Sequence, residues 1–315
     1  MSIISDSTRK IRSKFTLDNE YLCVNQHELM ADIKVQLICD DQSIDVTFTH
    51  LFLGYKPMIL AIPKSAFKTF PENCKLQFYT KSILCGSLDL VRSEAQHASL
   101  IIFSATGSEL HLLNFFQRVF QLAKQLRRNK NLALYPSSSE YNQIRVAYSF
   151  PRNISVLIVE KDKTYNIFPT DLHGAIAKEE QYTISLRENG LAYKQILEAS
   201  TISLSNVSSK YFQNVYSLGK NHMKGMVPFR KISHLLNVPE PNFPYYSYKN
   251  CNNCIALRKN NELKIGIHNL MTFSIVDRID HTKNLDSLSH IHEFYALWRN
   301  RHEFKDRLLI RAKNH

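Results

Sequence analysis

The chain has 315 residues, enough for one large or two ordinary domains, and 44 % of them are hydrophobic and 22 % charged, as in an ordinary globular protein. No apolar run approaches the about 18 residues that a membrane-spanning helix needs, and residues 1–15 lack the apolar core of a secretory signal. The six cysteines are scattered along a chain without such a signal. We therefore expect reduced thiols, a cytoplasmic protein and no membrane partner.

The formal net charge of +12 raises the question of a nucleic-acid partner. The densest basic patches lie in residues 9–14, 124–130 and 299–313, and they carry no zinc-finger spacing, RNP-like aromatic strand or helix-turn-helix pattern. Solvated faces and chain ends explain these patches, so we expect no nucleic-acid partner. A basic surface also favours anionic ligands, which include nucleotide phosphates.

Residues 16–105 are rich in strand patterns. Residues 33–39 alternate between apolar and polar side chains, residues 40–43 form a turn, and residues 44–48 return as a second strand. Further strands are predicted at 57–62, 75–80, 82–92 and 98–104.

This first hairpin has a counterpart later in the chain. VQLICDDQSIDVTFTHL (35–51) can be set beside VLIVEKDKTYNIFPTDL (156–172), since both have an apolar strand, a polar turn and a second strand. Two interpretations stay open. Either the first region is a divergent second copy of the later one, or two generic hairpins coincide.

Residues 106–128 give the clearest helical pattern. Thr106 and Glu109 have the spacing of a capping box, and apolar residues from Leu112 to Leu126 recur every three or four positions. The polar stretch 129–143 then has the composition of a linker. We therefore predict a strand-rich N-terminal domain (1–135) that ends in an amphipathic helix, and a second domain (136–315).

The second region begins with the β-branched apolar run 154–159, which predicts a strand buried on both faces. After a polar turn and the strand 165–168 come Thr170, Asp171 and His173, next to Gly174. Small polar groups beside a glycine suit a phosphate or a ring edge, although a turn with solvated side chains gives the same pattern.

Alternating strands and short helices follow. We predict strands at 182–187 and 201–207, and helices at 191–197, 211–219 and 229–236. A strand from 254 is expected to turn at Asn260 and Asn261 and to return over 263–279.

These segments, in this order, resemble the flavin reductase-like family, whose members fold as FMN-binding split barrels. The resemblance covers roughly residues 145–285. It rests on VLIV (156–159), YNIFPTD (165–171), SLR (185–187), TISLSNV (201–207), VYSLGKNH (215–222) and GIHNLMTFSIVDRI (266–279). It implies a mainly β (α+β) fold, in which a split β-barrel with flanking helices follows a strand-rich domain that can be a divergent barrel.

The resemblance further implies a flavin oxidoreductase that binds FMN and passes hydride to it from NAD(P)H, as a homodimer with the flavin near the dimer interface. The hydride chemistry would belong to the cofactor. His268 would stand against the flavin ring as the catalytic position, although a plain strand histidine explains it as well. The implied cofactor-binding residues are Asn166, Phe168, Pro169, Thr170, Asp171, Ser185, Arg187, Lys194, Lys220 and Asn221. Among these, the Arg187 guanidinium can pair two phosphate oxygens at once.

Two positions depart from the family pattern. Ile267 stands where the family has an aspartate, and Asp171 stands where it prefers a small hydroxyl. A carboxylate next to a phosphate repels it. The alternative is therefore a non-catalytic flavin-binding or scaffold protein whose barrel has lost reductase activity.

The last part of the chain offers two weaker patterns. Cys251 and Cys254 form a C-x-x-C pair without a second pair or a compact histidine pair at the usual spacing, so we predict no metal site. Residues 285–310 have a helical pattern that includes the only tryptophan, Trp298. We expect a terminal helix that covers a barrel edge or joins a dimer.

Overall fold

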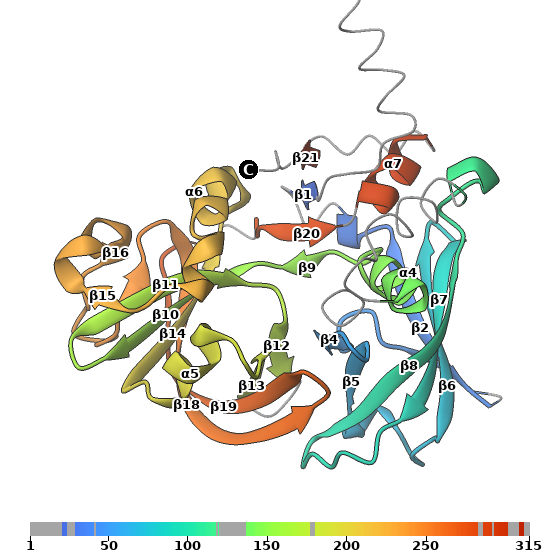
Figure 1. Ribbon diagram of the computed structural model, residues 1–315, viewed down its shortest axis with the longest axis horizontal. Coiled ribbons are helices and arrows are strands. Elements are labelled where there is room, and N and C mark those ends of the chain that lie inside the picture. Colours follow the sequence, from blue (N-terminus) through green and yellow to red (C-terminus); the bar gives the residue numbers. More distant parts are fainter. Residues whose placement is uncertain are drawn as a thin grey trace, which may run out of the picture.

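The computed structural model describes residues 21–23, 29–40, 42–117, 119, 137–176, 180–282, 286–291, 293–301 and 309–311. Two large antiparallel sheets dominate these residues and lie side by side, one built from residues 33–110 and the other from residues 155–280 (Figure 1). The mainly β fold that the sequence predicts is confirmed. Within the described ranges, no helix is long and apolar enough to cross a membrane.

The first sheet has seven strands in the order β3-β2-β6-β7-β8-β5-β4. Its strands are β2 (Ile33–Cys39), β3 (Gln42–Asp45), β4 (Leu51–Gly54), β5 (Ile59–Pro63), β6 (Asn73–Thr80), β7 (Ile83–Arg92) and β8 (Leu100–Leu110). The predicted alternation in β2 sends Val35 and Leu37 into the core, where both are fully buried.

The second sheet has eight strands in the order β12-β13-β19-β18-β14-β10-β11-β15. Its strands are β10 (Ser155–Lys161), β11 (Thr164–Thr170), β12 (His173–Ile176), β13 (Gln181–Arg187), β14 (Thr201–Val207), β15 (Val227–Pro228), β18 (Cys251–Ile265) and β19 (His268–Asp280). Val156 and Ile158 enter one hydrophobic cluster and Leu157 and Val159 another, so β10 is buried on both faces as its apolar run predicts.

Smaller elements connect and cover these sheets. A four-stranded sheet is formed by β1 (Tyr21–Cys23), β9 (Arg152–Asn153), β20 (Ser289–Ile291) and β21 (Leu309–Arg311), and a two-stranded sheet by β16 (Leu236–Asn237) and β17 (Ser247–Tyr248). Helices with both ends inside the described residues are α4 (Ser138–Ala147), α5 (Leu191–Leu197), α6 (Phe212–Ser217) and α7 (Glu293–Arg301). Short 3₁₀ turns are η1 (Lys64–Ala66), η2 (Ser209–Tyr211), η3 (Gly219–Met223), η4 (Phe229–Lys231) and η5 (Ser233–Leu235).

The two large sheets have the same topology. When β2 to β8 are matched in chain order with β10, β11, β12, β13, β14, β18 and β19, the spatial order of the first sheet reproduces that of the second. The second sheet adds β15 at one edge and inserts α5 between β13 and β14. The chain therefore contains the same sheet twice. We call the sheet of residues 33–110 the first copy and the sheet of residues 155–280 the second copy.

The spacing of the strands supports this correspondence. Strands β10, β12 and β13 begin at Ser155, His173 and Gln181, each 122 residues after the first residue of β2, β4 and β5. The hairpin turns also agree, because Asp40 and Asp162 both lie in the left-handed region at φ 50° and 48°. The alignment of the two hairpins made from the sequence, 35–51 beside 156–172, is one residue out of register. The structure matches Val35 with Leu157 and not with Val156.

Helices α4 and α7 pack on the first copy, although both follow the boundary predicted near residue 136. Val146 of α4 and Phe294, Tyr295 and Trp298 of α7 belong to the same hydrophobic cluster as Leu37. A capping box at Ser137 and Glu140, which the sequence analysis missed, starts α4. The domain limits stay a prediction, but these contacts join the two helices to the first copy.

The helix predicted over 106–128 is wrong in its first part. Strand β8 continues to Leu110, and the glutamate of the supposed capping box, Glu109, instead contacts Lys75 and Ser87 across the sheet. Residues 115–117 are helical, and residue 118 and residues 120–128 lie outside the described residues. The capping-box spacing therefore coincides with a strand whose side chains already have cross-strand partners.

Three further predictions for the second half need correction. The strand β18 continues through Asn260 and Asn261 with an irregular register, and the reversal occurs at Gly266, at φ 59°. The terminal helix expected over 285–310 is shorter, since β20 precedes α7 and β21 follows it. The segment 229–236 forms two 3₁₀ turns, η4 and η5, and not one helix.

A disulfide joins Cys39 and Cys74, so the expectation of six reduced thiols is wrong for this pair. The two residues face each other across β2 and β6, with their Cα atoms 4.5 Å apart. Their separation of 35 residues hides this proximity in the sequence. Cys251 and Cys254 are free thiols buried in β18, and burial raises the pKa of both. The cytoplasmic location stays a prediction.

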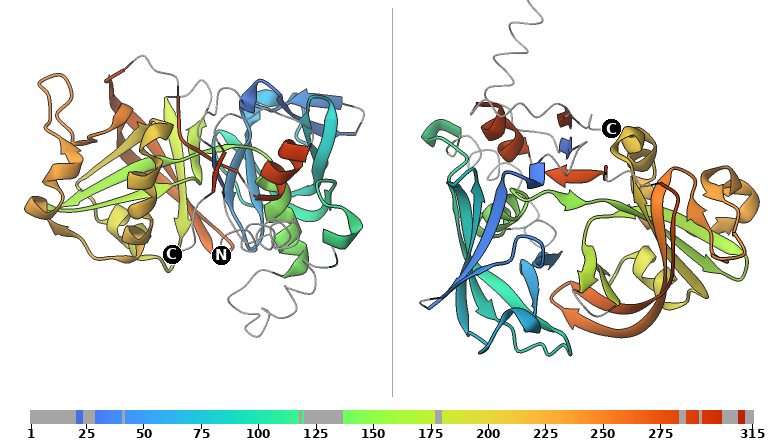
Figure 2. Two further views of the ribbon diagram at one scale, coloured as in Figure 1. Left: turned by 90° about the horizontal axis from the view of Figure 1, so that it is seen from above. Right: turned by 180° about the vertical axis from the view of Figure 1, so that it is seen from behind.

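The two copies meet along β4 and β12, which are edge strands of their sheets and contact each other. A shared hydrophobic cluster contains Leu53, Ile59 and Leu100 of the first copy with Ile176 and Leu270 of the second. Each edge therefore covers the other, which is one way of protecting unpaired strand edges. We call this contact the seam; it is visible where the two sheets approach each other in Figure 2.

Candidate ligand-binding site

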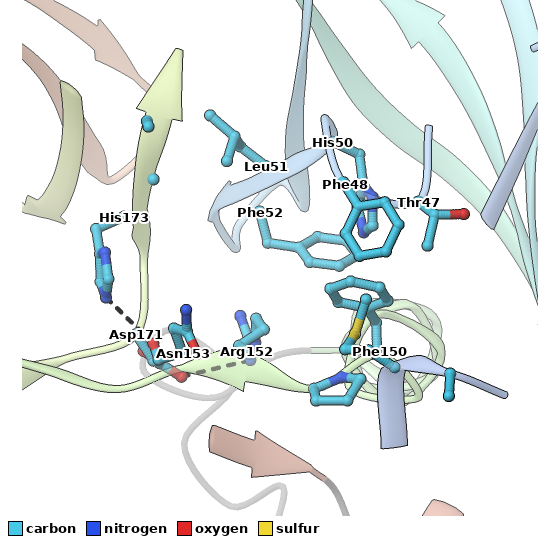
Figure 3. A pocket seen from close by; sticks show the side chains of 15 residues that line it. Thr47, Phe48, His50, Leu51, Phe52, Phe150, Arg152, Asn153, Asp171 and His173 are labelled. Atoms are coloured by element: carbon cyan, nitrogen blue, oxygen red, sulfur yellow. Dashed lines mark hydrogen bonds and ion pairs between the residues drawn. The ribbon is translucent and has the colours of Figure 1, made fainter. Parts of the chain in front are cut away.

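A cavity of about 630 Å³ opens at one end of the seam (Figure 3). Its volume falls within the range of about 300–1,000 Å³ that is typical of small-molecule sites. The lining comes from both copies and from the segment that enters β10. The lining residues are Met30, Ala31, Thr47, Phe48, His50, Leu51, Phe52, Phe150, Pro151, Arg152, Asn153, Asp171, His173, Gly174 and Ala175.

One wall of the cavity is aromatic. The His50 ring lies 4.5 Å from Phe150 and 5.4 Å from Phe52 between centroids, both in edge-to-face geometry. Phe48 is 81 % exposed, which is unusual for so large an apolar side chain. This wall, which we call the aromatic wall, offers flat apolar surface to a ring.

His50 carries an unused polar atom on this wall. Its Nδ1 lies 2.6 Å from the Val46 carbonyl and donates to it, and its buried Nε2 has no hydrogen-bond partner among the described residues. Burial lowers the pKa of His50 to about 4, so the ring is neutral at physiological pH. Nε2 is therefore a buried acceptor beside the cavity.

The opposite wall is charged, and we call it the polar wall. The Asp171 carboxylate lies 3.6 Å from Arg152 and 3.6 Å from His290, and it accepts a bond from the Tyr148 hydroxyl at 3.4 Å. Burial by itself would raise the pKa of Asp171, but Arg152 and His290 outweigh it and hold the pKa well below its usual value. The pair is ionised at neutral pH and keeps Arg152 in a fixed position.

Arg152 reaches the cavity from the strand β9. Its guanidinium lies 3.2 Å from the centroid of the Tyr148 ring and 5.6 Å from that of Phe52, so it bridges the two walls. Only 7 % of the residue is exposed. A buried guanidinium held between aromatic rings and a carboxylate is a preorganised donor to an anion or a carbonyl oxygen.

His173 completes the polar wall. Its Nδ1 lies 2.7 Å from the Tyr182 hydroxyl and its Nε2 lies 3.1 Å from the Asn153 carbonyl oxygen. Burial lowers the pKa of His173 to about 4, against the attraction of Asp171. The imidazole is therefore neutral.

Asp171 is the one member of the predicted cofactor set in the cavity lining. Phe168 is fully buried in the core of the second copy, and Pro169 and Thr170 pair with Val156 and Ser155 in the ladder of β11. These three residues shape the strand that leads to Asp171.

Asn166 and Asn221 come together as predicted, but they bind each other's segments. Asn166 donates to Gln195 at 2.7 Å and to the Asn221 carbonyl at 3.0 Å, while Asn221 donates to the Ile167 carbonyl at 2.9 Å. This network ties β11 to α5 and η3. Lys194 on α5 and Lys220 on η3 are exposed.

Ser185, Arg187 and His268 lie on one face of the second copy, at the far end of β4 from the cavity. Arg187 and His268 are directly opposite in the β13–β19 ladder. His268 packs edge-to-face on Tyr55 at 4.9 Å and against Gly54, and its ring nitrogens have no hydrogen-bond partner among the described residues. Burial first, and Arg187 second, lower the pKa of His268 to about 4.

The sequence analysis missed most of the cavity. Arg152, His50 and the three phenylalanines were not singled out, because no local motif contains them. A signal was present in the duplicated hairpin, since both of its copies supply lining residues just beyond their second strands.

A mainly β protein with a curled antiparallel sheet and a ligand-sized cavity at its edge is the class that these observations define. No protein-family model and no curated protein matches the sequence. Solved flavin reductases and FMN-binding proteins are similar to about half of the chain, and they belong to the family that the sequence motifs resemble.

Three of these structures give the extent of the similarity. An NADH:FAD oxidoreductase from Streptomyces globisporus is 9 % identical, covers 50 % of this chain and 91 % of its own, and has a TM-score of 0.42. An FMN-binding protein from Thermus thermophilus is 14 % identical, with 51 % and 89 % covered and a TM-score of 0.39. BorF, the flavin reductase component of a bacterial two-component tryptophan halogenase, is 9 % identical, with 56 % and 99 % covered and a TM-score of 0.42.

Proposed function

We propose that this protein binds FMN in the cavity at the seam and passes hydride from NAD(P)H to the bound flavin. The observation that carries the proposal is the pairing of an aromatic wall with a buried guanidinium in one ligand-sized cavity. A flavin nucleotide combines a flat ring system with an anionic phosphate, and these two walls match those two parts.

The residues present fit the two parts of this ligand unequally. Phe48, Phe52 and Phe150 supply ring surface beside the neutral His50 imidazole. Arg152 supplies the cation for the phosphate. Asp171 would repel a phosphate, but its charge is already met by Arg152 and His290 at 3.6 Å each. A phosphate at this position therefore competes with Asp171 for the guanidinium.

The cofactor supplies the hydride chemistry when it is bound. The chain's own residues position and shield it. The three phenylalanines exclude water from the ring, and Tyr148, Asp171 and His290 hold Arg152 where it can bind an anion. Such a preorganised charge loses little entropy on binding, because its neighbours already fix its rotamer.

Ser185, Arg187 and His268 keep a separate role in the proposal. They lie at the other end of β4, where Tyr55 and Gly54 cover His268. Direct contact of His268 with the flavin ring stays a prediction of the family resemblance, and the proposed site does not use it, because the cavity lies at the opposite end of β4. Tyr55 is held by Arg187, which donates to its hydroxyl and stacks on its ring.

An absorbance spectrum of the purified protein tests the proposal directly. We expect a flavin band after FMN is added at micromolar concentration, and bleaching of that band by NADH or NADPH under anaerobic conditions. A protein that takes up no FMN would overturn the proposal. A yellow protein that no nicotinamide bleaches would leave the non-catalytic flavin-binding alternative.

A further inference from the structure

Part of the cavity lining is built from equivalent positions of the two copies. Met30 and Ala31 lie 122 residues before Arg152 and Asn153, and Leu51 and Phe52 lie 122 residues before His173 and Gly174. This is the offset that relates β2, β4 and β5 to β10, β12 and β13. The cavity is therefore lined twice by the same part of a duplicated sheet.

The seam shows the same relation. The strand β4 contacts β12, which is its own counterpart, as happens where an approximate two-fold axis passes between two copies. Ile59 and Gln181 are equivalent positions, and they pair with Ser104 and Ser274 respectively. Equivalent positions in β8 and β19 are therefore 170 residues apart. By this offset Leu270 is the counterpart of Leu100. These two leucines share one hydrophobic cluster. The cavity and the seam thus lie on an approximate two-fold axis within one chain.

The two copies have diverged at these positions. Met30, Phe48 and Leu51 of the first copy are apolar, whereas their counterparts Arg152, Thr170 and His173 are polar. Thr47 and His50 show the reverse difference, because their counterparts are Pro169 and Leu172. At the other end of the seam the same offsets of 122 and 170 residues match the small residues Ser65 and Ala98 with Arg187 and His268. A symmetric cavity on an axis would accept a ligand in two equivalent orientations, but this one has two unlike walls.

We infer that the chain is a single-chain version of a two-subunit site, which holds one amphipathic planar anion per chain in one orientation. The ring faces the first copy, and the anionic end faces Arg152 of the second copy. The identity of the ligand as FMN rests on the proposed function. The number of ligands per chain and the single orientation of the ligand rest on the duplicated walls. Because both halves are present in one chain, we expect a monomeric functional unit in place of the homodimer that the family resemblance implies.

The matched variants come from the duplication itself. Phe48→Thr and Arg152→Met each replace a wall residue by the residue at the equivalent position of the other copy, and Val238→Thr and Lys249→Met are controls on exposed positions away from the cavity. Phe48 is 81 % exposed, so its variant is expected to fold even if Arg152→Met does not.

The experiment combines sedimentation of the full chain with a titration by FMN and, separately, by 1-anilinonaphthalene-8-sulfonate, an aromatic probe with one anionic group. We expect a monomer that binds one FMN, with affinity about tenfold weaker in Phe48→Thr and at least tenfold weaker in Arg152→Met, and unchanged in both controls. Two bound FMN per chain, or one per two chains, would overturn the inference.

The anilinonaphthalene probe separates this inference from the proposed function. If FMN does not bind, the flavin proposal fails. One probe molecule per chain that both wall variants weaken would then still support the inference. Probe binding that neither wall variant alters would overturn it.

Discussion

The two copies of the sheet share their strand order but differ in the polarity of the face that they turn to the seam. In the first copy, Ile59, Ala61 and Ile102 are buried and apolar. Their counterparts in the second copy are Gln181, Thr183 and Thr272. One topology therefore tolerates either an apolar or a polar face at the same place.

The polar face is tolerated because its groups find partners. Thr183 donates to the Gly174 carbonyl at 3.1 Å, and Thr272 lies 2.8 Å from Nε2 of His97, which comes from the first copy. Buried hydroxyls with partners cost little, whereas orphans cost about 1–3 kcal/mol each. Ser185 and His268 are exceptions on this face, because the buried polar atoms of their side chains have no hydrogen-bond partner among the described residues.

The largest expected effect comes from lowering the pH, because it charges histidines in both copies. The pKa values of His50, His173 and His268 are each lowered to about 4 in the folded protein, whereas an unfolded histidine titrates near 6.5. Stability is therefore retained above pH 6.5 and lost as the pH falls toward 4, on the order of 1 kcal/mol per pH unit for each histidine. Urea midpoints measured between pH 7 and 4 check this slope; a flat profile would contradict it.

The next largest effect is expected from Arg152→Met, which gives the polar wall the residue of the equivalent position in the first copy, Met30. The variant takes the guanidinium away from Asp171 and leaves it near His290, Tyr148 and His173. Removing one partner of a buried ion pair costs about 3–5 kcal/mol, and Asp171 is partly exposed, so we expect about 3 kcal/mol. Chemical denaturation beside Lys249→Met measures the difference, and equal stability of the two variants would show that the pair is not structural.

A smaller loss is expected where the second copy touches the first at the β18–β19 turn. Gly266 lies at φ 59°, and a Cβ there would come within 2.3 Å of the Lys56 carbonyl oxygen. Gly266→Ala should lower the free energy of unfolding by about 1–3 kcal/mol. Gly225→Ala is the matched control, because nothing lies within 4 Å of its added Cβ. The comparison fails if both glycine variants behave alike.

The smallest expected effect on stability is that of Phe48→Thr, which removes an exposed ring from the first copy. Surface changes away from packing usually stay within about 0.5 kcal/mol, so the melting temperature should hardly move. Ligand affinity should nevertheless fall, because the ring surface of the aromatic wall is reduced. A variant with a changed melting temperature and unchanged affinity would assign Phe48 to folding and not to binding.

The resemblance in the second half predicted the order of the elements more accurately than their roles. The strand at 201–207 and the helix at 191–197 lie where the sequence places them. Of the ten predicted cofactor residues, Asn166 and Asn221 stabilise the contact of β11 with η3 and α5, and Asp171 lines the cavity. A motif fixes the neighbours of a residue along the chain, but a hydrogen bond can go to a ligand or to the protein's own backbone.

The sequence by itself determined the strands, because alternation and β-branched runs act over a few residues, and it also carried the repeated hairpin. Only the tertiary structure decided which residues meet at the seam. Arg152 lies more than 100 residues after Phe48 and His50 in the chain, and the three residues meet because two edge strands pack on each other. The Cys39–Cys74 bridge likewise depends on the pairing of β2 with β6. Contacts of this kind follow from the topology, which a local pattern does not specify.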